Sequence, residues 1–213
     1  MPEFFEPLIL YLVLFFPGIT AAAPPSGNVA AFSAIGQMLR LFTYSIPALG
    51  LIWYLVLEKK SFFVQRPIKP QKKDLFSFIP GFFGLILIGA GITFLISRFS
   101  PSTVPPVIEP PSDIPGWIVM FFSCLGTGYL EESFFRFYLL QKLKDWIPLL
   151  PLRVLFSVLL FAFCHGYEGP WGVVNAVLAG LLLSVLFEKY KTLHGIAWAH
   201  ALYNVFVYIT GAI

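Results

Sequence analysis

Seven apolar segments, separated by short polar or proline-rich stretches, run through the chain. They are residues 8–23, 33–57, 75–97, 116–140, 152–165, 171–187 and 195–212. A helix needs about 20 apolar residues to span a bilayer, with about 17 to 25 usual. The pattern therefore predicts an all-α protein, a polytopic bundle of about seven transmembrane helices. The first and fifth segments are shorter than a typical span.

Composition supports a membrane protein. Of the 213 residues, 58% are hydrophobic and 12% are charged, and the mean hydropathy is +0.81. A soluble domain carries about 25% charged residues. The net charge of +3 is small and does not suggest a nucleic acid partner. Membrane lipid is the expected surrounding of the whole chain.

The loops predict an orientation. Residues 58–74 hold six of the fourteen basic residues, whereas residues 98–116 hold one basic residue and six prolines. The positive-inside rule places the first loop in the cytoplasm and the second, polyproline-like loop outside. Alternation along the chain then predicts seven spans with the N-terminus inside and the C-terminus outside.

Three charges in the fourth apolar segment require an explanation. Each of Glu131, Glu132 and Arg136 costs about 2.5 to 3.5 kcal/mol at the centre of a membrane helix unless it finds a partner. Glu132 and Arg136 are four residues apart, so they share a helix face and can form an ion pair. Glu131 is rotated by roughly 100° and is left without the arginine. A carboxylate held in a dry site in this way suits a general base or acid.

Two further polar pairs follow at helical spacing. Phe161 and His165 are four apart near the end of the fifth segment, and His200 and Asn204 are four apart in the seventh. Polar groups that face lipid are penalised, so these faces should converge on one interior cavity together with Glu131. For His165 and for His200 the alternative remains a structural role, in which the histidine only forms a hydrogen bond between two helices.

Other polar and sulfur-containing residues predict less. His194 lies at a helix start beside Lys191 and is expected at the surface. Arg40 in the second segment either reaches toward the membrane surface or caps a kink. Cys124 and Cys164 lie inside apolar runs without a CxxC motif, so they are expected to be buried thiols rather than a zinc or redox pair.

The three motifs together resemble a known family. The sequences "EESFFR" from Glu131, "FAFCH" from Phe161 and "HALYN" from His200 fit EExxxR, FxxxH and HxxxN. In this order and spacing they resemble the CPBP family of intramembrane proteases, which includes the type II CAAX prenyl endopeptidases and bacteriocin-processing relatives. The resemblance divides the chain into residues 1–115, which carry no motif, and a catalytic helical core at 116–213.

The resemblance implies a glutamate-dependent intramembrane endopeptidase without a cofactor. Glu131 and His165 would activate water, and His200 and Asn204 would stabilise the oxyanion. The partner would be a peptide or protein with a hydrophobic or lipid-modified segment, cleaved in a bacterial inner membrane. The remaining motif residues would support and orient the site: Glu132, Arg136 and Phe161.

Alternatives remain open at this point. Glu131, His165 and His200 could supply the ligands of a catalytic zinc, although no HExxH motif is present. Cys124 lies seven residues before Glu131 on nearly the same helix face, so a thiol peptidase is a further option. A non-catalytic immunity or scaffold protein, or a transporter, would also use buried polar residues, although no inverted repeat is visible.

Overall fold

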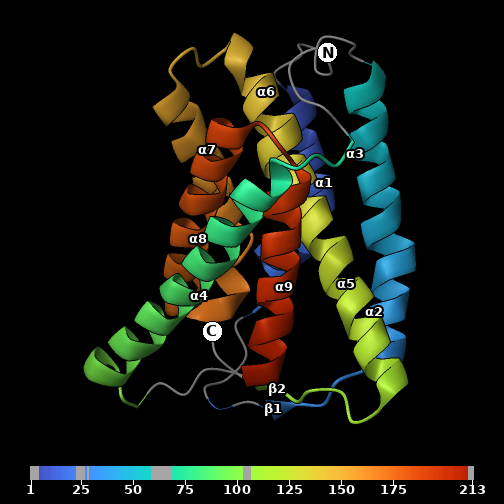
Figure 1. Cartoon of the computed structure of the whole chain (residues 1–213), viewed down its shortest axis with the longest axis vertical. Coiled ribbons are helices and arrows are strands. Elements are labelled where there is room, and N and C mark those ends of the chain that lie inside the picture. The colour runs from blue at the N-terminus through green and yellow to red at the C-terminus, as the bar shows by residue number, and fades with distance from the viewer. Residues whose placement is uncertain (1–4, 23–26, 28, 59–68, 103–106, 211–213) are drawn as a thin grey trace.

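The computed structural model of the chain describes residues 5–22, 27, 29–58, 69–102 and 107–210. Figure 1 shows helices packed lengthwise into one bundle. The helical elements are α1 (Phe5–Thr20), α2 (Ala34–Arg40), η1 (Leu41–Ser45), α3 (Ile46–Glu58), α4 (Asp74–Phe99), α5 (Ile114–Glu132), η3 (Ser133–Leu139), α6 (Leu140–Lys142), η4 (Leu143–Asp145), α7 (Leu150–Phe163), η5 (Gly166–Glu168), α8 (Gly169–Tyr190) and α9 (His194–Thr210).

The helical fold predicted from the sequence is confirmed. The elements α2, η1 and α3 follow one another without a break, as do α5, η3, α6 and η4. In the described ranges this leaves seven helical rods, and each overlaps one predicted apolar segment. One detail was not predicted. The two-residue strands β1 (Val29–Ala30) and β2 (Val107–Ile108) pair in parallel at one end of the bundle, with Val29 opposite Val107.

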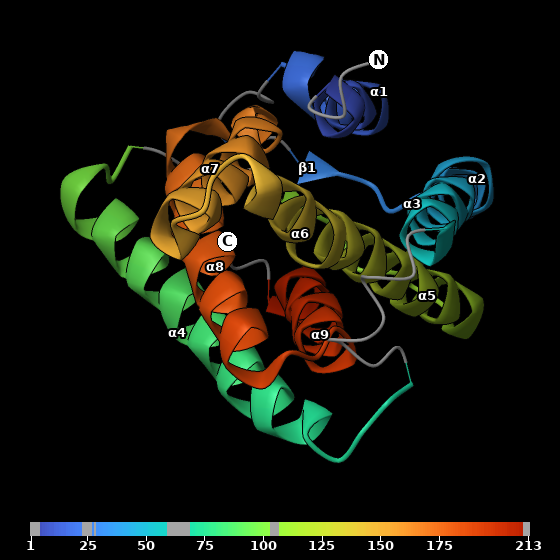
Figure 2. The same ribbon diagram turned by 90° about the horizontal axis from the view of Figure 1, so that it is seen from above.

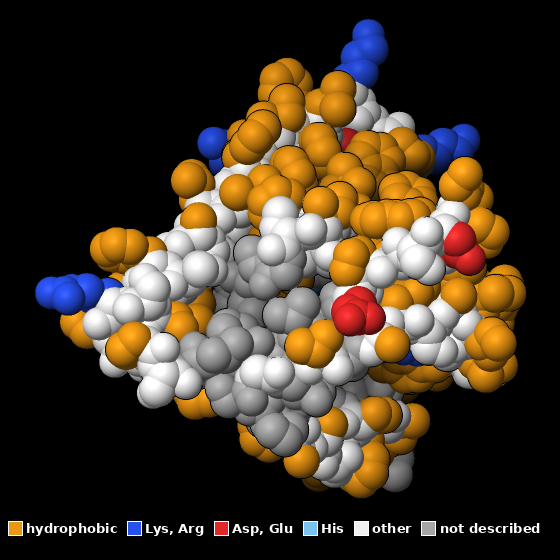
Figure 3. All heavy atoms as spheres, turned by 90° about the horizontal axis from the view of Figure 1, so that it is seen from below, with side chains coloured by type: hydrophobic (Ala, Val, Ile, Leu, Met, Phe, Trp, Pro, Cys, Tyr) orange, Lys and Arg blue, Asp and Glu red, His pale blue; other side chains and the backbone are white. Residues whose placement is uncertain are grey.

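The surface of the bundle is that of an integral membrane protein. Large apolar side chains are exposed along the outer faces of the helices, especially on α4, and Figure 3 shows hydrophobic side chains over much of one face. Extended apolar surface of this kind marks contact with a membrane or partner. Among the residues that the structure describes, three helices are long and apolar enough to cross a membrane, at 34–58, 74–99 and 166–190, and two shorter apolar helices are α1 and α7. The number of seven spans stays a prediction.

Helix α9 lies between α4 and α5 and contacts both (Figure 2). Two glycines allow this close packing. A Cβ atom at Gly195 would lie 2.1 Å from the carbonyl oxygen of Asp74, and a Cβ atom at Gly128 would lie 2.9 Å from that of Ala197. Asp74 Oδ1 also accepts a hydrogen bond from the Gly195 amide at 3.3 Å, which satisfies an amide in the first turn of α9. The position of α9 along the bundle is thereby fixed.

Helix α1 packs against the middle of the chain. The rings of Phe15 and Phe134 lie 5.0 Å apart between centroids, and Tyr11 donates a hydrogen bond to the carbonyl oxygen of Leu160 at 2.7 Å. Near its N-terminal end, Glu6 forms an ion pair with Lys142 at 2.7 Å. The first helix, which carries no motif, therefore shares the hydrophobic core with the elements that do.

Candidate active site

Glu132 is the acceptor at the centre of a buried polar cluster. Its Oε1 atom lies 3.0 Å from Nη1 of Arg136 and 2.8 Å from Nδ1 of His200. Glu132 and Arg136 are both 0% exposed. The structure thus contains the ion pair predicted from the four-residue spacing, and it adds His200 to it. A buried carboxylate with two such donors is tightly held.

The helix changes geometry directly after Glu132. Residues Ser133–Leu139 form the π-helical segment η3, and π-helical turns inside α-helices are rare and frequent at functional sites. Neighbouring side chains satisfy polar groups of this segment: Ser157 Oγ donates to the carbonyl oxygen of Phe135 at 2.9 Å, and Trp53 Nε1 donates to Ser133 Oγ at 3.2 Å. The local change of twist is therefore supported by contacts from α3 and α7.

Arg136 connects α5–η3 to two other helices. Its Nη2 atom donates to the carbonyl oxygen of Gly180 in α8 at 3.2 Å, and its guanidinium carbon lies 4.4 Å from the ring centroid of Phe161 in α7. A Cβ atom at Gly180 would lie 3.1 Å from Phe161 and 3.2 Å from Nη2 of Arg136. Glycine therefore makes room for both the guanidinium and the ring, and the cation–π contact adds to the stabilisation.

Phe161 and His165 contact each other directly through a hydrogen bond and through their rings. Helix α7 ends at Phe163, and the Nδ1 atom of His165 lies 2.7 Å from the carbonyl oxygen of Phe161. The two rings lie 4.4 Å apart between centroids. A carbonyl oxygen only accepts, so Nδ1 carries the proton in this hydrogen bond. In the neutral ring, Nε2 is then the nitrogen with a free lone pair.

A cavity of about 490 Å³ lies beside the cluster. Glu131 and His165 both line it, and Oε2 of Glu131 makes no hydrogen bond within the described part of the chain. Cavities of roughly 300 to 1,000 Å³ are typical of small-ligand sites. The other lining residues are Phe15, Pro17, Gly18, Ala21, Arg40, Tyr44, Thr127, Leu130, Cys164 and Tyr167.

The position of His200 differs from the expectation that all four motif residues would line one cavity. His200 and Asn204 are not among the residues that line it. His200 lies behind Glu131, with Nε2 3.7 Å from Glu131 Oε2, because its Nδ1 is bound to Glu132. A proton on both nitrogens of His200 would balance the charges of the two glutamates and Arg136. Asn204 is half-buried one helical turn further along α9.

Several residues around the site carry no signal in the sequence. Arg40 and Tyr44 come from the second helical rod, which has no motif, and Gly180 contributes only its backbone and its missing side chain. The surface position predicted for His194 is wrong. This side chain is 8% exposed, and its Nδ1 lies 2.8 Å from the hydroxyl of Tyr129, because the first turn of α9 is packed between α4 and α5.

The zinc and thiol alternatives gain no geometric support. In the part of the chain that the structure describes, no three or more His, Cys, Asp or Glu side chains are grouped to hold a metal ion. The hydrogen bonds of His165 and His200 use Nδ1 in both rings, so they leave Nε2 open and do not themselves decide against a metal. Cys124 is buried and does not line the cavity of Glu131.

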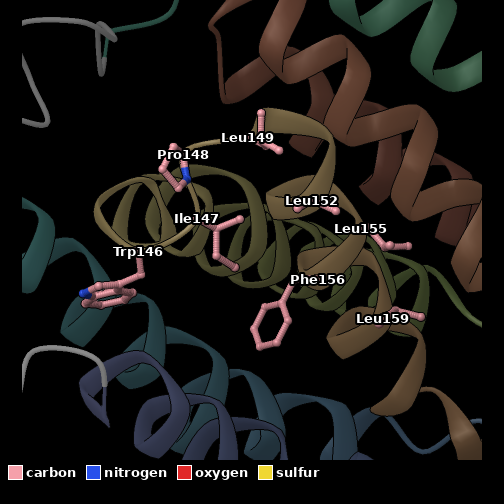
Figure 4. A pocket seen from close by; sticks show the side chains of 8 residues that line it. All are labelled: Trp146, Ile147, Pro148, Leu149, Leu152, Leu155, Phe156 and Leu159. Atoms are coloured by element: carbon pink, nitrogen blue, oxygen red, sulfur yellow. The ribbon is translucent and has the colours of Figure 1, made fainter.

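A second hollow of about 440 Å³ lies on the hairpin between α6 and α7 (Figure 4). It contains none of the predicted site residues, and its lining is apolar. The residues are Trp146, Ile147, Pro148, Leu149, Leu152, Leu155, Phe156 and Leu159. The hollow offers no group for acid–base chemistry, so the cavity beside Glu131 is the candidate active site.

Fold and site together define a helical integral membrane protein with a carboxylate and a histidine that line one cavity. Residues 113–206 match the family model described as type II CAAX prenyl endopeptidase Rce1-like. The matched stretch contains all three motifs. No curated protein and no solved structure matches the chain. The family match supports an intramembrane peptidase in general.

Proposed function

We propose that the chain is an intramembrane endopeptidase in which Glu131 is the general base. The observation that carries the proposal is that Glu131 and His165, from α5 and from the end of α7, line the same cavity. Glu132, by contrast, is occupied by Arg136 and His200. Of two adjacent carboxylates, one is fixed by cations and the other is available to a reactant.

In the proposed reaction, Glu131 and His165 act on one water molecule. Glu131 removes a proton as the water oxygen attacks the carbonyl carbon of the scissile peptide bond. His165 can accept a hydrogen bond through Nε2, because Nδ1 donates to the carbonyl oxygen of Phe161. General acid–base catalysis of this kind contributes about 10² to 10⁴ in rate.

The oxyanion formed by the attack would be stabilised by His200 and Asn204. Glu132 holds His200 through Nδ1, and Nε2 of the same ring lies 3.7 Å from Oε2 of Glu131, so an N–H at Nε2 would be next to the reacting atoms. When the tetrahedral intermediate collapses, the carbon–nitrogen bond breaks and the proton taken by Glu131 passes to the leaving amine. The products are a carboxylic acid and an amine, and no other reactant is needed.

The surroundings of the cavity favour a hydrophobic or lipid-modified peptide as the substrate. Apolar side chains from α1, including Phe15 and Pro17, form part of its wall. A substrate of this kind partitions into the bilayer and can approach from there. We place the protein in a bacterial inner membrane. The basic loop at 58–74 favours an orientation with the N-terminus inside and the C-terminus outside.

The test is cleavage by the purified protein in liposomes. The probe is a farnesylated CAAX peptide, with products identified by mass spectrometry. We expect cleavage by the wild type, no detectable cleavage by Glu131→Gln, and wild-type activity for Glu109→Gln, a matched change at an exposed loop position. A wild type that leaves the peptide intact, as a non-catalytic immunity or scaffold protein would, contradicts the proposal. Full activity of Glu131→Gln also contradicts it.

A further inference from the structure

Thr127 places a hydroxyl group one helical turn before the candidate base. It precedes Glu131 by four residues in α5, so the two side chains share a helix face, with their Cβ atoms about 5 to 6 Å apart. Both residues line the same cavity. Side chains on a helix lean toward its N-terminus, so Glu131 leans toward the turn that carries Thr127. The next residue on that turn, Gly128, faces the backbone of α9 instead.

The hydroxyl of Thr127 is not used by the fold. A threonine inside a helix can donate to the carbonyl oxygen four residues earlier. The other helical threonines in the described part of the chain all do so: Thr20, Thr43, Thr93 and Thr210. Thr127 makes no hydrogen bond with any described residue, and its side chain is half-buried. A hydroxyl without a partner is costly away from water, so its partner has to come from the cavity.

The two other hydroxyl groups among the described residues of the cavity wall already have partners. Tyr44 donates to the carbonyl oxygen of Leu14 in α1, and Tyr167 is hydrogen-bonded to the carboxylate of Glu168. Both tyrosines line the cavity together with Thr127. Thr127 therefore supplies the hydroxyl of this wall that is open to a reactant.

The proposed reaction leaves one position on the attacking water unfilled. A water molecule has two hydrogens and two lone pairs. Glu131 and Nε2 of His165 accept the two hydrogens, and one lone pair points at the carbonyl carbon of the scissile bond. The second lone pair needs a donor, and both a carboxylate and the free nitrogen of a neutral imidazole only accept. A threonine hydroxyl can donate.

We propose that Thr127 donates this hydrogen bond and holds the attacking water against Glu131. The hydroxyl keeps its own proton, while the proton of the water passes to Glu131 as the oxygen–carbon bond forms. Three contacts then fix the water, so its remaining lone pair is directed at the carbonyl carbon, and such orientation lowers the barrier. The inference rests on the proposed function and adds to it a third catalytic residue that touches the reacting water.

The experiment removes the hydroxyl without changing the shape of the side chain. Thr127→Val replaces the hydroxyl by a methyl group and keeps the branched Cβ atom. We expect kcat for the farnesylated peptide to fall by about 10- to 100-fold with KM unchanged. Thr127→Ser keeps the hydroxyl and should retain most of the wild-type kcat. The matched control is Thr93→Val in α4, outside the cavity, which should keep wild-type kinetics.

Two further measurements distinguish catalysis from a structural role. The melting temperature of Thr127→Val in detergent should match that of the wild type, because the fold loses no hydrogen bond. On a Glu131→Gln background, which does not cleave, a fluorescent farnesylated peptide should bind equally well with Thr127 and with Val at this position. The hydroxyl then acts on the water and not on the substrate.

Three results would overturn the role of Thr127. The first is a wild-type kcat for Thr127→Val when Glu131→Gln is inactive, in which case the peptidase proposal stands without this residue. The second is an equal loss of kcat in Thr127→Ser and Thr127→Val, which would assign the residue to packing. The third is weaker binding of the peptide to Thr127→Val, which would make it a substrate contact. A wild type that cleaves nothing contradicts the peptidase proposal, and the role of Thr127 falls with it.

Discussion

The Nδ1 atom of His165 donates a hydrogen bond of 2.7 Å to the carbonyl oxygen of Phe161, four residues earlier in the chain. This contact fixes both the tautomer and the direction of the imidazole at the end of α7. It also gives Phe161 a second role, because the ring of the same residue lies against the guanidinium of Arg136. One phenylalanine thereby links the histidine of the cavity to the buried ion pair.

The two adjacent glutamates should respond differently to the same substitution. Glu131→Gln should lower the cleavage rate by at least about 10² and leave the melting temperature close to that of the wild type. Glu132→Gln should destabilise the fold by about 3 to 5 kcal/mol, because it leaves Arg136 buried without its counter-charge. Thermal unfolding in detergent and peptide cleavage are measured on the same preparations. A stable, inactive Glu132→Gln together with an active Glu131→Gln would reverse the assignment.

Asn204→Ala should separate catalysis from binding. Losing one donor to an oxyanion costs about 10² to 10³ in rate. Asn204 is half-buried, so its removal should leave the fold intact. We expect slow cleavage with an unchanged affinity for the uncut farnesylated peptide. An Asn204→Ala variant that cleaves at the wild-type rate would remove this residue from the mechanism.

Removing metal ions with a chelator tests whether the reaction is independent of metal. If Glu131 and His165 act on water directly, strong chelators should leave the activity of the purified protein unchanged. Metal content and cleavage rate are determined on one detergent-purified sample before and after chelation. Stoichiometric zinc whose removal stops the reaction, and whose return restores it, would establish the zinc alternative. Magnesium or calcium salts serve as the control for non-specific effects of the chelator.

The close contact of α5 and α9 should be sensitive to a single methyl group. Gly128→Ala should destabilise the protein by about 1 to 3 kcal/mol, because the new Cβ atom meets the backbone of α9. Activity should fall as well, since this contact holds His200 beside Glu132. The matched control is Gly91→Ala in α4, where a Cβ atom would meet nothing within 4 Å. It should be neutral or slightly stabilising. Equal melting temperatures for the two variants would contradict the packing argument.

The sequence alone was sufficient for the features that depend on spacing along one helix. The long apolar runs predict the seven helical rods, because a chain in lipid must satisfy its backbone hydrogen bonds within each segment. The four-residue spacing of Glu132 and Arg136 predicts their ion pair, and the rotation between adjacent residues separates Glu131 from it. The same reasoning places Phe161 and His165 on one face.

The features that depend on contact between helices came only from the tertiary structure. The rotation of each helix about its own axis decides which face contacts a neighbouring helix. Glycines such as Gly128 and Gly195 set how closely α9 approaches α5 and α4. That approach buries His194 and brings His200 to Glu132 instead of the cavity. Arg40 reaches the cavity because η1 packs on α5. Periodicity is a local property, whereas these contacts join residues far apart in the chain, so no spacing in the sequence could predict them.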